Sequence, residues 1–173
     1  MVESVIKWVI VGRRDDFRRS AFIRTVEHMF LGRYDHSFDE KGRISIPARF
    51  REMLIDGAYV TQGFDRNLMV WRAADFERIY HQINSLSITD PDARLLKRLI
   101  FANAVKIEID KAGRMLLPQY LRDAVDLTGA SVVVGVGDYF ELWSPENWTK
   151  QNDQMQDSDT TAKRFAALNL TVM

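Results

Sequence analysis

The chain contains an internal repeat. Residues 30–54 align with residues 101–125 at a shift of 71 positions, and six of the 25 aligned positions are identical. Most other core-type positions exchange one apolar residue for another, as in Ile46 and Leu117. The identical pairs are Phe30/Phe101, Asp39/Asp110, Gly42/Gly113, Arg43/Arg114, Pro47/Pro118 and Arg51/Arg122. Low overall identity with matching glycine, proline and charged positions predicts two copies of one supersecondary unit.

The match continues when one extra residue is allowed. At a shift of 72, Val60 pairs with Val132 and Trp71 pairs with Trp143. In each copy, alternating apolar residues predict a strand, and the Asp-x-x-Gly-Arg segment that follows predicts a tight turn, because glycine tolerates a positive φ. A second strand, a short helix opened by the proline, and two further strands complete each copy.

These patterns give approximate bounds for the elements. In the first copy we expect a helix over 48–54 and strands over 58–62 and 67–71; in the second, a helix over 119–125 and strands over 131–136 and 139–143. Between the copies, apolar residues at helical spacing predict two amphipathic helices, 73–86 and 90–101. The second of these helices has Asp90 as its N-cap, followed by a proline.

One copy is too small to form a core by itself, since a unit of about 50 residues buries too little apolar surface. We therefore expect the two copies to pair about a pseudo-two-fold axis and to share one barrel-like core. The predicted class is α+β, mainly β, with flanking helices. The expected division is an N-terminal extension 1–28, a first unit 29–76, connecting helices 77–103, a second unit 104–148 and a C-terminal tail 149–173.

Composition narrows the possible functions. Lys and Arg number 24, as do Asp and Glu, so a net charge of zero offers no simple electrostatic case for nucleic acid. Cysteine is absent and the three histidines are scattered, which excludes disulfides and disfavours a metal site. The apolar stretch 5–11 is too short to span a bilayer. We expect a cytoplasmic protein that has no cofactor, no metal and no membrane contact.

The two turns carry the candidate functional residues. Pairing about an axis presents Asp39–Arg43 and Asp110–Arg114 in related positions on one surface. For the aspartates, a structural role is as well supported as a functional one, because Asp often caps turns by accepting backbone N–H groups. For the arginines a functional role is favoured, because a loop-tip guanidinium beside Lys41 or Lys111 suits phosphate or guanine edges. The aspartates would then orient the arginines.

Catalytic alternatives find little support in the sequence. Asp39 and Glu40 are adjacent carboxylates, but neighbours on a strand point to opposite faces. The second copy has Lys111 where the first has Glu40, so the carboxylate pair is not repeated. A small hydrolase is disfavoured because no nucleophile and base converge in both copies. We expect a protein that is not an enzyme.

The tandem motif is specific enough to indicate a family. The first copy reads Met29-Phe30-x-Gly32 and then Phe38-Asp39-x-Lys41-Gly42-Arg43-x-x-Ile46-Pro47-x-x-Phe50-Arg51. The second reads Asp110-x-x-Gly113-Arg114-x-x-Leu117-Pro118 and closes with Phe140-Glu141-Leu142-Trp143. Over residues 29–150 the chain resembles the MraZ family of bacterial transcriptional regulators, which groups with the AbrB/SpoVT-type swapped-hairpin barrels.

The resemblance implies both a fold and a function. The fold would be two tandem AbrB/SpoVT-like units that form a pseudo-two-fold swapped-hairpin barrel. The function would be sequence-specific regulation, usually repression, of the division and cell-wall gene cluster that includes the protein's own operon. Family members assemble as ring-shaped homo-oligomers, bind short direct repeats in double-stranded DNA, and are cytoplasmic and nucleoid-associated.

The resemblance also implies roles for individual residues. It places Arg43 and Arg114 at the DNA surface, with Lys41 and Lys111 as phosphate contacts and with Asp39, Gly42, Asp110 and Gly113 in orienting or turn roles. The second motif departs from the first, because Ala112 stands where the first copy has its lysine. The alternative is a non-enzymatic protein-binding module of the same fold that uses helices 73–86 and 90–101.

Residues 1–28 also depart from the family, whose members typically begin at the position of Met29. We expect this segment to be a misassigned upstream start rather than a functional arm. The intact mass of the natively expressed protein tests this, since a mass that includes residues 1–28 would contradict it.

Overall fold

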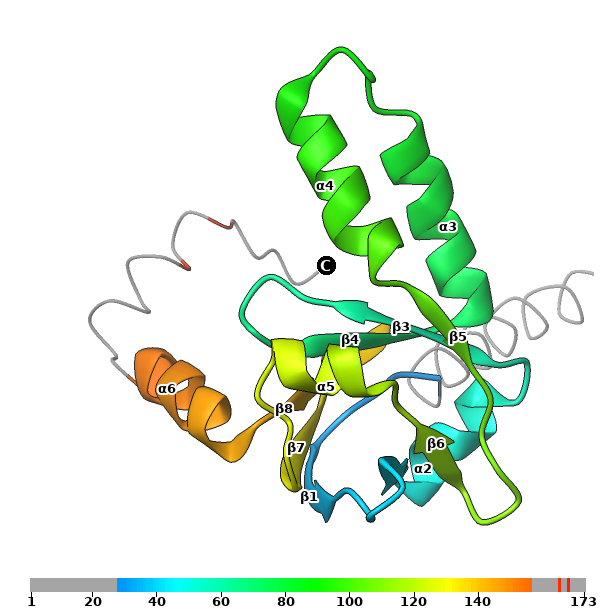
Figure 1. The fold of residues 1–173 in the computed structure, drawn as a ribbon, viewed down its shortest axis with the longest axis vertical. Helices are drawn as coiled ribbons and strands as arrows, with labels where there is room; N and C mark the ends of the chain where they lie inside the picture. The colour runs from blue at the N-terminus through cyan, green and yellow to red at the C-terminus, as the bar shows by residue number, and fades with distance from the viewer. Residues whose placement is uncertain (1–27, 157–164, 166–167, 169–173) are drawn as a thin grey trace, which may run out of the picture.

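Both copies of the repeat contain two strands, a short helical segment and two further strands, in that order. A computed structural model describes residues 28–156 together with Phe165 and Leu168. The first copy contains β1 (Arg33–Ser37), β2 (Arg43–Ser45), α2 (Ala48–Arg51), the 3-10 helix η1 (Glu52–Leu54), β3 (Ala58–Gln62) and β4 (Leu68–Arg72). After α3 (Ala73–Asn84) and α4 (Pro91–Ala102), the second contains β5 (Val105–Ile107), β6 (Arg114–Leu116), α5 (Gln119–Ala124), β7 (Ala130–Gly135), β8 (Tyr139–Trp143) and α6 (Pro145–Gln156). This confirms the predicted α+β, mainly β class (Figure 1).

A few element bounds differ from those expected. The helix expected over 48–54 is α-helical only to Arg51 and then tightens into η1, as short helices often do at their ends. Helix α6 extends to Gln156, and the division of the chain into units stays a prediction. Residues 1–27 of the expected extension, and 157–164, 166–167 and 169–173 of the expected tail, lie outside the described residues.

The strands pair between the two copies. β1 pairs antiparallel with β7, and β5 pairs antiparallel with β3. Because β4 also pairs with β8, a six-stranded sheet forms in the order β1-β7-β8-β4-β3-β5, while β2 and β6 form a second sheet. Single bridges, Phe38 to Ile44 and Ile109 to Met115, connect the two sheets. Each pairing thus has its equivalent in the other half, which gives the pseudo-two-fold arrangement; the closed swapped-hairpin barrel stays a prediction.

The structure corrects one pairing of the sequence repeat. Val60 lies opposite Val70 in the β3–β4 pair, and Val133 lies opposite Leu142 in the β7–β8 pair. The structural equivalent of Val60 is therefore Val133, not Val132. Val60 and Val133 are both fully buried in the shared core. A slip of one residue would turn the side chain to the other face of the sheet, so burial sets the register.

Apolar side chains from both copies form one buried cluster. Ile44 of β2 and Met115 of β6 lie opposite each other and are fully buried in it. The rings of Phe30, Phe50 and Phe140 contact one another, with centroids 5.0 to 5.2 Å apart. Since both copies contribute to this single core, their turns are held in a fixed relation to each other.

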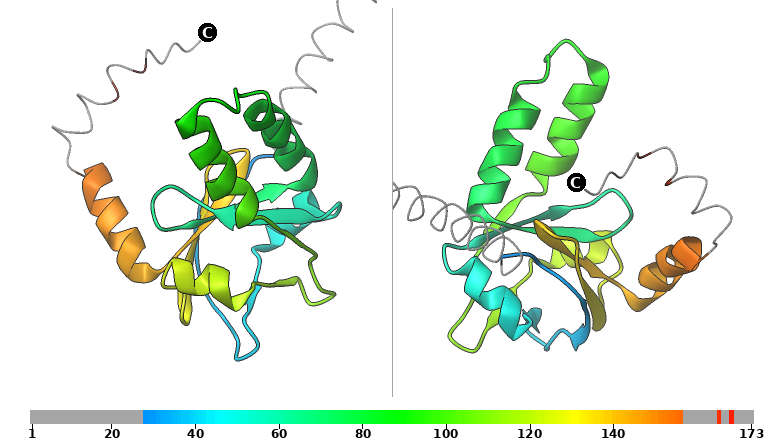
Figure 2. Two further views of the ribbon diagram at one scale, coloured as in Figure 1. Left: turned by 45° about the horizontal axis from the view of Figure 1, so that its top comes forward. Right: turned by 180° about the vertical axis from the view of Figure 1, so that it is seen from behind.

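Helices α3 and α4 form a hairpin that projects from the sheet (Figures 1 and 2). The Asp90 carboxylate caps α4 as predicted and accepts hydrogen bonds from the backbone N–H groups of Asp92 and Ala93. A second, smaller apolar cluster, which includes Met69 and Phe76, joins the hairpin to the sheet. Within the described residues, no helix has the length and apolar character needed to cross a membrane.

Candidate nucleic-acid interface

The carboxylate of Asp39 organises the first turn. Its Oδ1 accepts hydrogen bonds from the backbone N–H of Lys41 at 3.0 Å and from that of Arg43 at 2.9 Å. Gly42 adopts a φ of +76° within the turn, in the region that favours glycine. The aspartate thus fixes the backbone from which both cationic side chains extend.

The second turn has the same geometry. Oδ1 of Asp110 accepts hydrogen bonds from the backbone N–H groups of Ala112 and Arg114, both at 2.9 Å. Gly113 adopts a φ of +74°. The structural role considered for the aspartates is therefore present in both copies. In this turn Lys111 is the exposed lysine, one position earlier than in the first turn.

Each aspartate also binds the side chain of its own arginine. Oδ2 of Asp39 accepts a hydrogen bond from Nε of Arg43 at 2.7 Å and lies 2.6 Å from Nη2. The corresponding distances from Asp110 to Arg114 are 3.0 and 2.8 Å. Each aspartate thus binds the edge of its arginine's guanidinium group that is formed by Nε and Nη2. The other edge, formed by Nη1 and Nη2, points away from the aliphatic part of the arginine side chain.

These hydrogen bonds keep the carboxylates charged. Bonds from the Arg43 side chain, followed by its backbone N–H, lower the pKa of Asp39 to about 2. Bonds from Arg114, with its backbone N–H contributing most, also lower the pKa of Asp110. An aspartate is already ionised at neutral pH, and the lowered pKa values keep both carboxylates charged, and so able to bind their arginines, under more acidic conditions as well.

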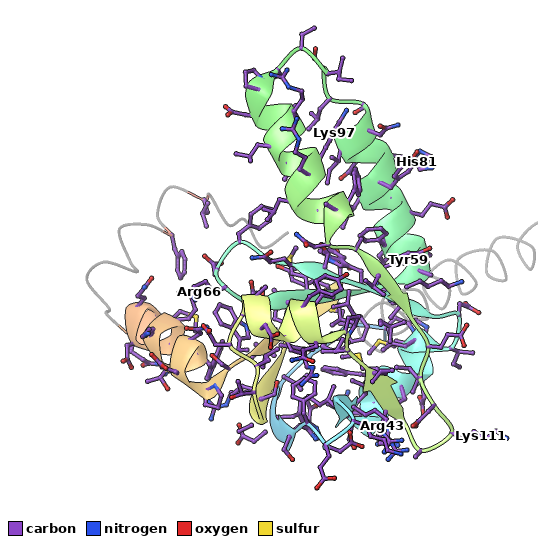
Figure 3. All side chains as sticks on the ribbon, viewed as in Figure 1. Arg43, Tyr59, Arg66, His81, Lys97 and Lys111 are labelled. Atoms are coloured by element: carbon purple, nitrogen blue, oxygen red, sulfur yellow. The ribbon has the colours of Figure 1, made fainter. Side chains whose placement is uncertain are left out.

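The two turns converge into a single cluster. Nη1 of Arg114 lies 3.8 Å from Oδ2 of Asp39, the same oxygen that binds Arg43. The two arginine side chains are 30% and 32% exposed, so their guanidinium groups are within reach of a ligand. Figure 3 shows Arg43 and Lys111 at the same end of the molecule, opposite the α3–α4 hairpin. The structure thus brings together the residues that the sequence singled out from both turns.

Sequence reasoning assigned no role to two further arginines at this end. Arg51, at the end of α2, has its guanidinium against Gly113, and Arg122 of α5 has its guanidinium against Gly42. Each side chain therefore contacts the turn of the other copy. The signal was present in the repeat, because these arginines form one of its six identical pairs.

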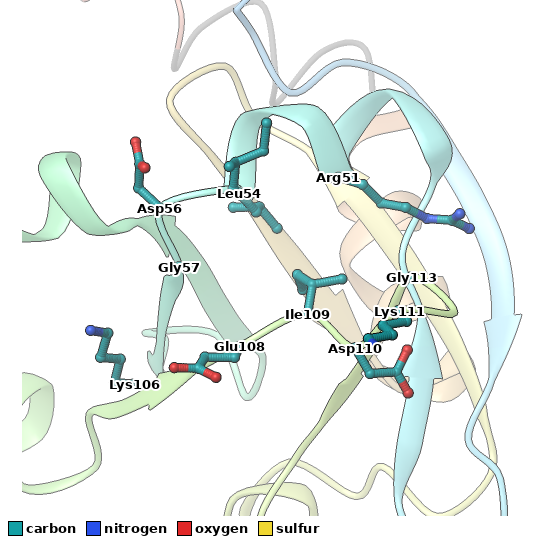
Figure 4. A pocket seen from close by; sticks show the side chains of 11 residues that line it. Arg51, Leu54, Asp56, Gly57, Lys106, Glu108, Ile109, Asp110, Lys111 and Gly113 are labelled. Atoms are coloured by element: carbon teal, nitrogen blue, oxygen red, sulfur yellow. The ribbon is translucent and has the colours of Figure 1, made fainter.

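A surface cavity of about 510 Å³ lies beside the second turn (Figure 4). Its charged lining balances, with Arg51, Lys106 and Lys111 against Asp56, Glu108 and Asp110. A cavity with equal numbers of both charges has no clear preference for an anionic or a cationic cofactor. Among the described residues, no group of three or more histidine, aspartate or glutamate side chains is arranged to hold a metal ion.

Comparison with known proteins assigns the fold to a family. The sequence matches the model of the family described as "MraZ protein, putative antitoxin-like" twice, over residues 29–99 and 100–169. Proteins named transcriptional regulator MraZ are similar to it: that of Thermomicrobium roseum is 44% identical, over 81% of this chain and 99% of its own length. That of Roseiflexus castenholzii is 41% identical, over 80% of this chain and 94% of its own. That of Carboxydothermus hydrogenoformans is 47% identical, over 69% and 84% respectively. The chain therefore belongs to the MraZ family of transcriptional regulators.

Proposed function

We propose that this regulator binds short direct repeats in the DNA upstream of its own operon, and represses the division and cell-wall gene cluster as a ring-shaped homo-oligomer associated with the nucleoid. The observation that carries the proposal is the convergence of both turns on Asp39, whose Oδ2 lies near Arg43 and Arg114 together. Two guanidinium groups beside one carboxylate are close enough to address neighbouring base pairs, which are about 3.4 Å apart along B-DNA.

Each residue of the cluster would have a distinct task. With Nε and Nη2 bound to its aspartate, each arginine can present the Nη1 and Nη2 edge to O6 and N7 of a guanine. Lys41 and Lys111 are exposed beside the arginines and would contact phosphates. Asp39 and Asp110 would orient the arginines and would not contact DNA.

The charge balance supports an oligomer. Residues 29–150 carry 16 basic and 17 acidic residues, so one chain has little general attraction for DNA. Several chains bound to several repeats would gain affinity through effective concentration, without further contacts in any one chain. A closed ring is one arrangement that would offer the clusters at regular intervals to direct repeats.

Fluorescence anisotropy with a duplex from the region upstream of the gene tests this proposal. Arg43→Ala and Arg114→Ala should each weaken binding by about 1–3 kcal/mol, roughly 5- to 150-fold, and relax base preference. Arg66→Ala is the matched control, because Arg66 forms an exposed ion pair with Asp126 away from the cluster (Figure 3). Unchanged affinity in the double variant, Arg43→Ala with Arg114→Ala, would refute DNA binding by the turns.

A protein-binding module remains the second candidate, because the α3–α4 hairpin exposes large apolar side chains. Tyr80, Ile88 and Leu95 are 44%, 72% and 64% exposed. Exposed large apolar side chains on a projecting hairpin are available for contact with a partner protein. If this candidate were correct, Leu95→Glu would abolish regulation of a reporter gene, whereas loss of both turn arginines would leave it intact.

A further inference from the structure

The short helix of each copy sends an arginine to the turn of the other copy. Nε of Arg51 donates a hydrogen bond to the carbonyl oxygen of Ile46 at 2.7 Å. The guanidinium lies so close to Gly113 that a Cβ added there would be 2.6 Å from Nη1 and nearer still to Cζ. Figure 4 shows this side chain running from α2 towards Gly113 in the turn between β5 and β6.

The same contact occurs a second time, related by the pseudo-two-fold axis. Nε of Arg122 donates to the carbonyl oxygen of Leu117 at 3.3 Å, and a Cβ added at Gly42 would lie 2.9 Å from Nη2. A backbone hydrogen bond accompanies each contact. The Leu117 N–H donates to the carbonyl oxygen of Gly42 at 3.1 Å, and the Ile46 N–H donates to the carbonyl oxygen of Gly113 at 2.9 Å. Each turn glycine is thus held by a strand end and a guanidinium from the other copy.

We propose that Arg51 and Arg122 are positioning residues, each of which holds the DNA-recognition turn of the opposite copy. The inference rests on the proposed function of the turns. Gly113 directly precedes Arg114, and Gly42 precedes Arg43 in the same way, so displacement of either glycine moves the guanidinium that follows it. Recognition by one copy then depends on a side chain of the other, and neither copy would form a complete recognition turn by itself.

The contact depends on the shape of the arginine side chain as well as on its charge. A planar guanidinium can lie against the surface left free by a glycine while its Nε remains bound to a carbonyl group. A lysine side chain keeps the charge, but it has no planar guanidinium group and no Nε–H donor. A simple phosphate contact would tolerate lysine, so an arginine-to-lysine substitution separates positioning from phosphate binding.

Hydrogen–deuterium exchange of the full chain tests the positioning role without DNA. Arg51→Lys should accelerate amide exchange in residues 111–114 by about tenfold and leave residues 41–43 unchanged; Arg122→Lys should have the reverse effect. Arg49→Lys is the control, because Arg49 is exposed on the same helix, α2. No acceleration in either variant, or acceleration only in the turn of the substituted copy, would overturn the proposal.

Titration of the same variants with the upstream duplex relates positioning to DNA binding. For a positioning residue, Arg51→Lys lowers affinity by about tenfold and leaves the slope of log affinity against log salt concentration unchanged. Wild-type affinity in Arg51→Lys, with a slope shallower by about 0.9 in Arg51→Ala, would identify a phosphate contact instead. If the wild-type protein fails to bind the duplex, the proposed function fails, while the exchange data still decide whether Arg51 holds the opposite turn.

Discussion

Replacing Gly113 by alanine would measure how closely the first copy surrounds the second turn. Gly113 has a φ of +74°, and an alanine in this left-handed region costs about 1–2 kcal/mol. The new Cβ would also overlap the guanidinium of Arg51, with 2.6 Å to Nη1. Because this guanidinium is the distal end of a flexible, exposed side chain, it can move aside at the cost of the hydrogen bond from its Nε to the carbonyl oxygen of Ile46, about 0.5–1.5 kcal/mol. The free energy of unfolding should therefore fall by about 1.5–3.5 kcal/mol in Gly113→Ala.

Gly137→Ala separates the cost of a positive φ from the cost of the overlap with Arg51. Gly137 also has a positive φ, +89°, but a Cβ added there meets no heavy atom within 4 Å. Its substitution should cost only the conformational part, about 1–2 kcal/mol. The difference between the two variants, about 0.5–1.5 kcal/mol, then reports the overlap with Arg51. In an Arg51→Ala background most of this difference should disappear, since the two residues are in contact.

Chemical denaturation at one fixed protomer concentration is the appropriate assay, because the stability of an oligomer depends on concentration. The reasoning would be refuted if Gly113→Ala cost no more than Gly137→Ala. It would also fail if the costs of Gly113→Ala and Arg51→Ala simply added, because a steric overlap requires both partners.

Three further predictions concern the core, a half-buried carboxyl and the salt dependence of binding. Phe50→Ala should destabilise the protein by about 3–5 kcal/mol in denaturation experiments, because it removes a buried ring from the aromatic cluster. Burial raises the pKa of Glu141, so the contribution of Glu141 to stability should decline as pH rises from the unfolded-state pKa through that raised value. Glu141→Gln should remove this decline in melting curves recorded from about pH 4 to pH 8. Lys41→Ala should make the slope of log affinity against log salt concentration shallower by about 0.9 in anisotropy titrations, without altering base preference.

The sequence was sufficient to predict most of the elements and the place of the turns. Gly42 and Gly113 were expected to have positive φ, and both do. Asp90 was expected to cap a helix ahead of Pro91, and it does. The local conformation of these features depends on a few neighbouring residues, so a short stretch of sequence predicts it; the contacts that hold each turn come from the other copy and are not predicted in this way.

The register of β7 could not be predicted, because apolar and polar residues do not alternate in its sequence. Residues 132–134 are three consecutive valines, so an apolar pattern fits any of them on the inner face of β7. Pairing with β8 places Val133 opposite Leu142 and buries it completely. The choice among the valines therefore depends on cross-strand contacts that a single chain segment does not reveal.

The contacts of Arg51 and Arg122 also could not be predicted from the sequence. Their identity in the repeat indicates that the position matters, but the contact made by each side chain lies on the other copy. That contact requires β2 and β6 to be paired, with Ile44 opposite Met115. Arg51 and Gly113 are 62 positions apart in the chain. Their contact can be inferred only once the strand pairing is known.

The neutral charge of the chain, taken with this geometry, limits how a single copy can recognise DNA. Each arginine is already bound to its own aspartate, so its remaining hydrogen-bonding capacity suits a directional contact with a base edge better than general attraction to phosphate. On the proposed function, Lys41 and Lys111 would supply few phosphate contacts, and the salt-dependent part of binding would be small for one chain. Contacts that are specific but weak give tight binding only when several of them form together, which requires that the spacing of the clusters match the spacing of the DNA sites. If the proposed function is correct, the protein should bind DNA with several regularly spaced sites more tightly than DNA with a single long site, and affinity should fall steeply when the spacing between sites is changed.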